Sequence, residues 1–238
     1  MIYFALRHII LTTVLFLFLP GCRPRSTPEP STEKIPARLP VQESVVDKDW
    51  IIDLILTEKS TIRFQEQAIH KKYLSQIFRT ITPYVSLSKW RLVVVQEESN
   101  RIRVLEAMED RFRDLGRDRL AEIMERWKPA PLLLVFCLPK TVDAFGGVPP
   151  EMVRSLALVE LGMGVQSLAL AARAYGVETH WIAGALLVNR EIKEALDVSE
   201  EYDVVFFGVA GYPSEEIIQK FPALREVCYA EGWGKPFR

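Results

Sequence analysis

The longest apolar stretch of the chain, from Val153 to Tyr175, predicts one long buried helix. At about 100° per residue its polar side chains fall on two narrow stripes, and Leu, Val, Met and Ala occupy the rest of the circumference. Gly176 is the expected helix stop, and residues 177–182 predict a short buried strand after it. Ionisable residues inside the helix argue against a membrane span, because each costs several kcal/mol in hydrocarbon.

Shorter apolar repeats on both sides of this helix predict further helices and strands. Helical spacing occurs in residues 46–55, 66–81, 99–127 and 189–196, and Gly116 is expected to divide the third of these segments into two helices. Apolar runs at 90–96, 131–138 and 202–209 predict strands. Because strands alternate with helices and no series of hairpin signals occurs, we expect a three-layer α/β/α domain of the α/β or α+β class.

The first 43 residues predict export and tethering rather than part of the fold. Residues 1–22 combine a short basic start, an apolar core and a Leu-Pro-Gly-Cys ending, which resembles the lipobox of bacterial lipoproteins, where Cys22 would be lipidated. An uncleaved anchor or a misassigned start is the alternative. Residues 23–43, rich in proline, serine and charge, predict a disordered tether. We therefore expect residues 44–238 to form one domain outside the cytoplasm, held to a membrane through the N-terminus.

Composition and charge exclude several partners. Hydrophobic residues make up 49 % and charged residues 26 % of the 238, which is an ordinary globular composition. A net charge of −1 with acidic and basic residues intermixed provides no electrostatic footprint for nucleic acid. The three cysteines and three histidines lack the spacing of metal ligands, so no metal site is expected.

Several short motifs follow one another in a distinctive order from Trp50 to the C-terminus. Their sequences are Lys-Ser-Thr-Ile-Arg-Phe at 59–64, a Trp before a Val-rich strand at 90–95, Glu-Leu-Gly-Met-Gly-Val-Gln-Ser at 160–167, Gly-Val-Glu-Thr-His-Trp-Ile-Ala-Gly at 176–184, and Val-Ala-Gly-Tyr-Pro at 209–213. Together they resemble the nitroreductase family of flavoproteins. The resemblance implies an α+β fold with a central mixed sheet around the long buried helix. It also implies a homodimer with that helix at its interface and FMN in each of two sites.

The first family motif, Arg-x-Ser-x-(Arg or Lys)-x-Phe, holds the FMN phosphate through its basic residues and its serine. Aligned on Ser60 and Phe64, this chain places Glu58 and Ile62 where the basic residues are expected. A phosphate carries a charge of about −2, so a carboxylate beside it is repulsive. This alignment therefore leaves the phosphate without its cations.

A shift by one residue restores the positive charge. Lys59, Thr61 and Arg63 then form Lys-x-Thr-x-Arg, which is the register we favour for holding phosphate. The family also uses a basic residue near the C-terminus, and Lys220 or Arg225 is positioned in the sequence to supply it.

Two further motifs resemble the family's contacts to the flavin. The family sequence Asn-x-Gln-Pro-Trp appears here with Ser86 and Ser88 in place of the amides and with Trp90 retained. Hydroxyls still donate hydrogen bonds, but they reach less far than amides. Trp181, Ile182, Ala183 and Gly184 stand where the family places backbone N–H groups against the flavin ring.

Gly162 and Gly164 do not form a dinucleotide fingerprint, because they lie inside a helix and do not follow a strand. We expect them to allow another helix or a partner chain to approach closely.

The resemblance implies an FMN-dependent oxidoreductase in which NAD(P)H reduces the flavin and the flavin then reduces a small nitroaromatic or quinone-like acceptor. The cofactor performs the redox chemistry, so no single catalytic side chain is assigned. The altered motifs at 58–62 and 86–88 motivate an alternative, in which a flavin-free nitroreductase-like domain serves as a membrane-tethered binding or scaffold protein.

Overall fold

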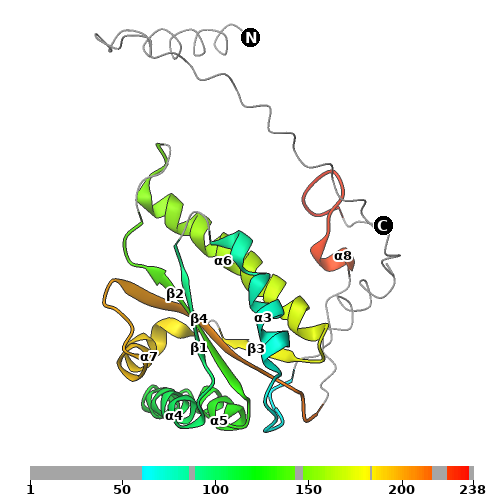
Figure 1. The fold of residues 1–238 in the computed structure, drawn as a ribbon. Helices are drawn as coiled ribbons and strands as arrows, with labels where there is room; N and C mark the ends of the chain where they lie inside the picture. The colour runs from blue at the N-terminus through cyan, green and yellow to red at the C-terminus, as the bar shows by residue number, and fades with distance from the viewer. Residues whose placement is uncertain (1–60, 86–88, 143–146, 183, 216–223, 236–238) are drawn as a thin grey trace, which may run out of the picture. The chain divides into compact units, whose positions relative to one another are not determined.

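The computed structural model describes residues 61–85, 89–142, 147–182, 184–215 and 224–235 (Figure 1). The predicted lipobox segment, the tether and the helix predicted at 46–55 lie outside these residues, so they stay predictions. Most of the other predicted elements are present. The helix predicted at 66–81 is shorter than expected, and it begins only after His70, whose side chain caps its N-terminus by accepting from Lys72 N.

A four-stranded sheet occupies the middle of the domain, in the order β1-β2-β4-β3. The strands are β1 (Arg91–Val95), β2 (Leu132–Pro139), β3 (Glu178–Ile182) and β4 (Tyr202–Gly211). Every pairing between these strands is antiparallel, so the prediction of a mixed sheet is wrong for the described strands. The connection between β1 and β2 consists of two helices, α4 (Glu98–Asp114) and α5 (Asp118–Trp127), that pack against each other. The chain therefore re-enters the sheet at the end where β1 stops, and Val95 lies opposite Leu133 in an antiparallel pair.

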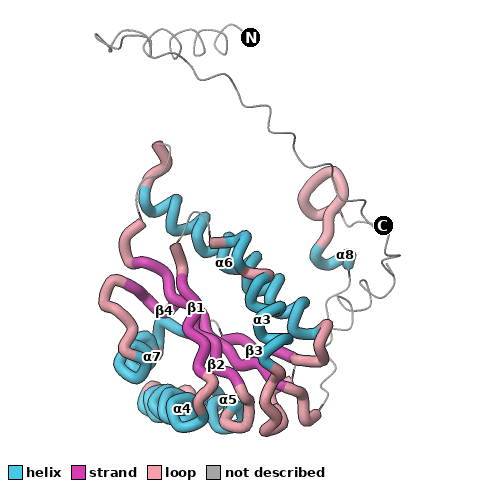
Figure 2. The backbone as a smooth tube through the Cα atoms, viewed as in Figure 1, coloured by secondary structure: helices cyan, strands magenta, loops and turns pink. Residues whose placement is uncertain are grey.

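Helices cover both faces of the sheet, as the three-layer prediction requires (Figures 1 and 2). On one face lie α4, α5 and α7 (Asn189–Leu196), and on the other lie α3 (Lys71–Arg79) and α6 (Pro150–Arg173). Among the described residues there are also the short helices η1 (Thr82–Tyr84), η2 (Ala185–Leu187) and α8 (Leu224–Val227). The predicted break at Gly116 and stop at Gly176 are confirmed, with φ values of +65° and +71° that favour glycine.

Strand β2 contributes to the core on both of its faces. Leu133, Val135 and Cys137 pack into the cluster with α4, α5 and α7. Leu134 and Phe136 belong to the cluster with α3 and α6. Successive side chains of a strand point to opposite faces, so a strand that is covered on both sides must be apolar throughout. This double burial explains the uninterrupted apolar run in the sequence.

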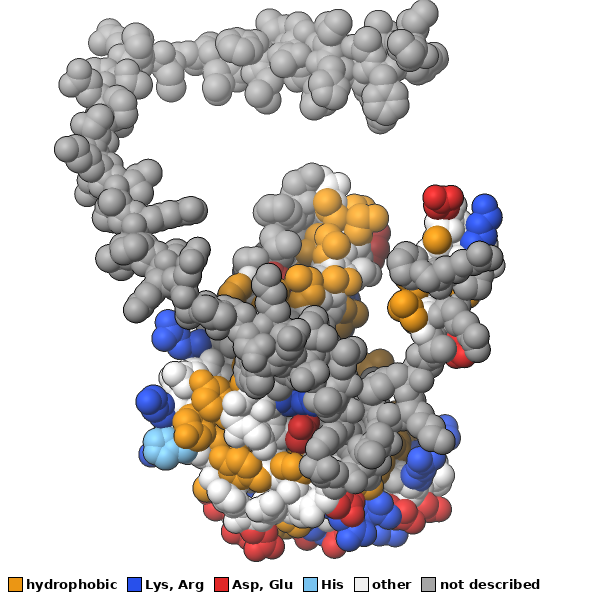
Figure 3. Space-filling model, turned by 90° about the vertical axis from the view of Figure 1, so that its right-hand side faces the viewer, with side chains coloured by type: hydrophobic (Ala, Val, Ile, Leu, Met, Phe, Trp, Pro, Cys, Tyr) orange, Lys and Arg blue, Asp and Glu red, His pale blue; other side chains and the backbone are white. Residues whose placement is uncertain are grey.

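Within a single chain, helix α6 is buried on one face only. Its inner face packs Ala157, Leu161 and Leu168 against the sheet. Its outer face exposes Val159 by 61 % and Met163 by 52 %, together with Met152 and Leu156. Hydrophobic side chains gather in the upper part of Figure 3, where α6 runs. The sheet and α3 can contact one side of a cylinder, so the apolar remainder stays exposed in a single chain.

Among the described residues α6 alone has the length and composition to cross a membrane, with 24 residues and a mean hydropathy of 1.5. Only 39 % of the apolar stretch within this helix is buried inside the protein. The buried part lies in the core cluster shared with α3 and the sheet.

The close packing of β3 on β4 requires a glycine at position 208. A Cβ atom at Gly208 would lie 2.2 Å from Trp181 Cε3 and 2.4 Å from the backbone oxygen of His180. The backbone oxygen of His180 cannot move without displacing β3. By contrast, a Cβ atom at Gly162 on the outer face of α6 meets nothing within 4 Å.

We therefore expect Gly208→Ala to lower the free energy of unfolding by about 2–3 kcal/mol or more, because it overpacks the sheet. The matched variant Gly162→Ala should raise it by roughly 0.5–1 kcal/mol through helix propensity. Urea denaturation followed by circular dichroism measures both. Equal stability of the two variants would contradict the packing described for Gly208.

Candidate functional site

The segment that carries the first motif runs beside the end of β4. Gln65 N donates to Tyr212 O at 2.9 Å, and Ser214 N donates to Arg63 O at 3.1 Å. Phe64 and Pro213 form an antiparallel bridge between these hydrogen bonds. The structure thus brings together the first and last of the family-like motifs, although about 150 residues separate them in the sequence.

Gly211 makes this approach possible. A Cβ atom there would lie 2.6 Å from Pro131 Cδ and 3.1 Å from Phe64 Cδ1, and Phe64 itself is buried. The glycine of Val-Ala-Gly-Tyr-Pro is therefore a packing requirement of the site.

Thr61 and Arg63 occupy different environments within the motif. Thr61 is fully buried, and its hydroxyl donates to Arg63 O at 2.8 Å and accepts from Arg63 N at 3.3 Å. The hydroxyl is thus engaged within its own turn. The Arg63 side chain points outward, with Nε 3.4 Å from Glu215 Oε1 and with exposed fractions of 56 % and 41 % for the two side chains.

Within the described part of the first motif, Arg63 is the residue that can bind a phosphate. An exposed ion pair contributes little, since water screens it. A phosphate could therefore displace Glu215 from the Arg63 guanidinium, which suits phosphate oxygens in its geometry and charge. Glu215 opposes the phosphate, and the sequence prediction missed it, although it stands only two residues after the last motif.

Trp90 is a core residue in this structure. It is 2 % exposed, its Nε1 donates to Tyr84 O at 2.7 Å, and its ring approaches Gly164, where a Cβ would be 3.3 Å from Cζ2. The glycine on α6 thus admits a tryptophan of the same chain. Trp90 connects Tyr84 with Gly164 of α6, and its burial leaves little of its ring surface for a flavin.

Strand β3 directs its two predicted site residues to opposite faces of the sheet. Ile182 is buried toward α4, α5 and α7. Trp181 lies on the α6 side and stacks on Phe206, with ring centroids 5.5 Å apart. Phe136 contacts both Trp181 and Trp90, at centroid distances of 5.9 and 5.7 Å. One aromatic cluster therefore unites the two tryptophans, and Phe136 and Phe206, which the sequence prediction missed, hold it together.

The strand ends close to η2, where Gly184 O accepts from Leu187 N at 3.0 Å. Lys59, Ser60, Ser86, Ser88, Ala183 and Lys220 lie outside the described residues, and Arg225 belongs to α8 without a described side chain. These residues stay predictions.

Burial makes the Cys137 thiol unreactive. Burial raises the pKa of the Cys137 thiol to about 11, so it stays protonated at neutral pH. Within the described ranges no three His, Cys, Asp or Glu side chains are grouped so that they could hold a metal ion.

The fold is shared with solved oxidoreductases, and the chain belongs to the nitroreductase family, whose sequence model matches residues 58–212. A BluB-like flavoprotein from Clostridium difficile is similar with a TM-score of 0.61 and 15 % identity, over 76 % of this chain and 98 % of that one. The NADPH:FMN oxidoreductase from Vibrio harveyi, solved in complex with NAD+, has a TM-score of 0.57 and 20 % identity, over 76 % and 77 %. The NfrA1 nitroreductase from B. subtilis has a TM-score of 0.59 and 16 % identity, over 77 % and 74 %.

His180 lies beside Trp181 on β3 and is held neutral. Its Nδ1 accepts from Trp127 Nε1 at 3.1 Å, which requires that this nitrogen carry no proton. Burial lowers the pKa of His180 below its ordinary value of 6.5. In the unfolded chain the imidazole takes up its proton at higher pH than in the folded protein.

The contribution of neutral His180 to stability is therefore complete above pH 6.5 and is lost as pH falls below it. We expect the free energy of unfolding to drop by up to about 1.4 kcal/mol per pH unit in this window. His180→Gln, which keeps an acceptor for Trp127 but does not titrate, should flatten the profile below pH 6.5. Parallel urea titrations measure both profiles. The same slope in both proteins would contradict this role.

Proposed function

We propose that the protein is an FMN-dependent oxidoreductase that takes electrons from NAD(P)H and passes them to a small nitroaromatic or quinone-like acceptor. Membership of the nitroreductase family supports the oxidoreductase class. One observation carries the cofactor assignment: the first motif lies beside residues 212–215 and presents the Arg63 guanidinium to solvent. When bound, FMN would supply the hydride and electron transfer.

The residues of the chain bind and orient the cofactor in this proposal. Arg63 holds the phosphate, and Lys59, Ser60 and either Lys220 or Arg225 add donors or charge around it. The aromatic cluster of Trp90, Phe136, Trp181 and Phe206 fixes the position of β3. The backbone N–H groups after Trp181, together with Ser86 and Ser88, would hydrogen-bond the ring and the ribityl chain. Thr61 supports the turn from inside.

A second candidate function is a flavin-free domain that serves as a binding or scaffold protein. Two observations favour it: the Thr61 hydroxyl is engaged inside its own turn, and Glu215 stands beside the described cation of the motif. A carboxylate at this place costs affinity for a phosphate. The presence or absence of bound flavin separates the two functions.

We expect the purified protein to show flavin absorption in the visible range, or to take up FMN with quenching of its fluorescence. Arg63→Met should raise the dissociation constant of FMN by about ten- to a hundred-fold, as expected for a lost charge-assisted hydrogen bond. Glu215→Gln should lower the dissociation constant several-fold, because it removes the repulsion between the carboxylate and the phosphate.

Arg103→Met is the matched control for this experiment, because Arg103 lies exposed on α4 and bonds Asn100 Oδ1 of the same helix. It should leave FMN affinity unchanged. A colourless wild-type protein that takes up no FMN would eliminate the enzyme and leave the scaffold.

We propose further that the exposed face of α6 joins two copies of the chain in a homodimer. Met152, Leu156, Val159 and Met163 follow one another at helical spacing and form a continuous apolar stripe. Such a stripe on a lone soluble chain is unfavourable unless something covers it. The family resemblance, which implies a dimer through the long helix, supports a second copy as the cover.

Val159→Glu should convert the dimer to a monomer, because it places an unpaired charge in the middle of the buried stripe. We expect the dimer dissociation constant to rise at least roughly a hundred-fold. Light scattering after gel filtration measures the mass. Leu186→Glu is the control, since Leu186 is 75 % exposed on η2, outside the stripe. A wild-type monomer, or a dimer unaffected by Val159→Glu, contradicts the proposal.

A further inference from the structure

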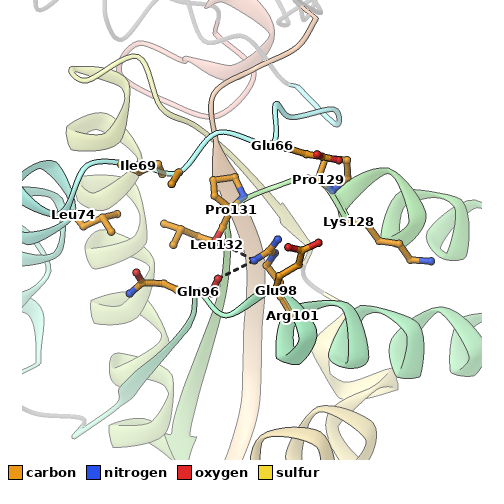
Figure 4. A pocket seen from close by; sticks show the side chains of 11 residues that line it. Glu66, Ile69, Leu74, Gln96, Glu98, Arg101, Lys128, Pro129, Pro131 and Leu132 are labelled. Carbon is orange, nitrogen blue, oxygen red and sulfur yellow. Dashed lines mark hydrogen bonds between the residues drawn. The ribbon is translucent and has the colours of Figure 1, made fainter.

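A pocket of about 290 Å³ opens at the end of the sheet where β1 stops and β2 starts (Figure 4). Its apolar wall consists of Ile69, Leu74, Pro131 and Leu132. This volume lies just below the range of roughly 300–1,000 Å³ that is typical of small-molecule sites. All of its lining residues are described, and none of the predicted flavin contacts belongs to it.

Arg101, on the first turn of α4, is the most deeply buried of the charged residues that line this pocket. Only 7 % of the residue is exposed. Its Nη1 donates to Gln96 O at 2.9 Å and lies 3.5 Å from Pro131 O. Its Nε is buried and has no hydrogen-bond partner. In Figure 4 the guanidinium lies among Gln96, Glu98 and Leu132, and the dashed lines mark the two backbone contacts.

Arg101 differs from the other buried cations among the described residues. Lys193 is paired with Glu200 at 2.8 Å, and Arg173 is paired with Glu178 at 3.3 Å. Arg101 has no carboxylate within ion-pair distance in the described part of the chain, and its hydrogen-bond acceptors are two neutral carbonyl oxygens. The Glu97 and Glu98 carboxylates attract it only from a greater distance. A buried guanidinium with an unsatisfied N–H is costly unless an acceptor and a counter-charge complete it.

The remaining charges select the kind of anion. Glu66 and Glu98 line the same pocket and are exposed to solvent. Lys128 also lines it, but its ammonium already pairs with Glu109 at 3.3 Å and with Glu125. Two carboxylates repel a dianion such as phosphate more strongly than a monoanion. A carboxylate also suits the planar guanidinium, which binds it in bidentate fashion.

We infer that this pocket binds a small monocarboxylate with an apolar body, whose carboxylate pairs with Arg101 and whose body packs on Ile69, Leu74 and Leu132. The site is separate from the proposed flavin site and does not depend on it. A purely structural Arg101, which only ties Gln96 to Pro131 through their carbonyls, is the competing explanation.

The test compares benzoate with benzamide, which has nearly the same shape without the charge, on the full-length protein by isothermal titration calorimetry. We expect benzoate to bind at least ten-fold more tightly than benzamide and than inorganic phosphate. Arg101→Met should abolish the preference for benzoate. Arg103→Met on the same helix and Arg63→Met at the proposed flavin site should both retain it, which localises the binding.

Equal affinity of benzoate and benzamide for the wild-type protein, or binding of neither at millimolar concentration, would overturn the inference. Loss of benzoate binding in Arg63→Met with retention in Arg101→Met would also overturn it, because the anion would then occupy the flavin site. The comparison of the two probes on the wild-type protein decides the question even if Arg101→Met does not fold. Because FMN uptake is measured separately, failure of this inference is distinguishable from failure of the proposed function.

Discussion

The double burial of β2 is the constraint on which the rest of the domain depends. Its odd-numbered and even-numbered side chains pack into two separate hydrophobic clusters, so both layers of helices are fixed relative to this one strand. β1 and β4 pair with it on either side, and β3 is placed by β4. The aromatic cluster passes through Phe136 of the same strand, so the position of Trp181 depends on β2 as well.

Glycines mark the places where this frame is packed most closely. Gly208 admits the Trp181 ring, Gly211 admits Phe64 and Pro131, and Gly164 admits Trp90. Each contact lets a segment carrying a family-like motif lie directly against the sheet or α6. The order of the motifs thus reflects packing demands of the fold. This explains how the frame of the family persists here while the basic residues of its phosphate motif differ.

Two arginines near residues 61–69, 96–101 and 212–215, at one end of the sheet, have different partners for their positive charge. Arg63 meets an exposed carboxylate, which water screens and which a stronger anion could replace. Arg101 is buried, and its hydrogen-bond acceptors are backbone carbonyls. The two arginines therefore differ in their surroundings: Arg63 is exposed beside Glu215, and Arg101 is a buried side chain in a pocket with both apolar and charged walls.

The sequence by itself determined the long helix, its stop at Gly176, the break at Gly116 and the strands, because periodicity and glycine conformation are local properties. It also carried enough ordered motifs to indicate the family. Only the tertiary structure decided that the described strands pair antiparallel, that half of α6 stays exposed, that Trp90 and Thr61 lie inside, and that Glu215 faces Arg63. These features arise from contacts between residues distant in the chain, such as Phe64 with Pro213, and no local pattern encodes which partners meet.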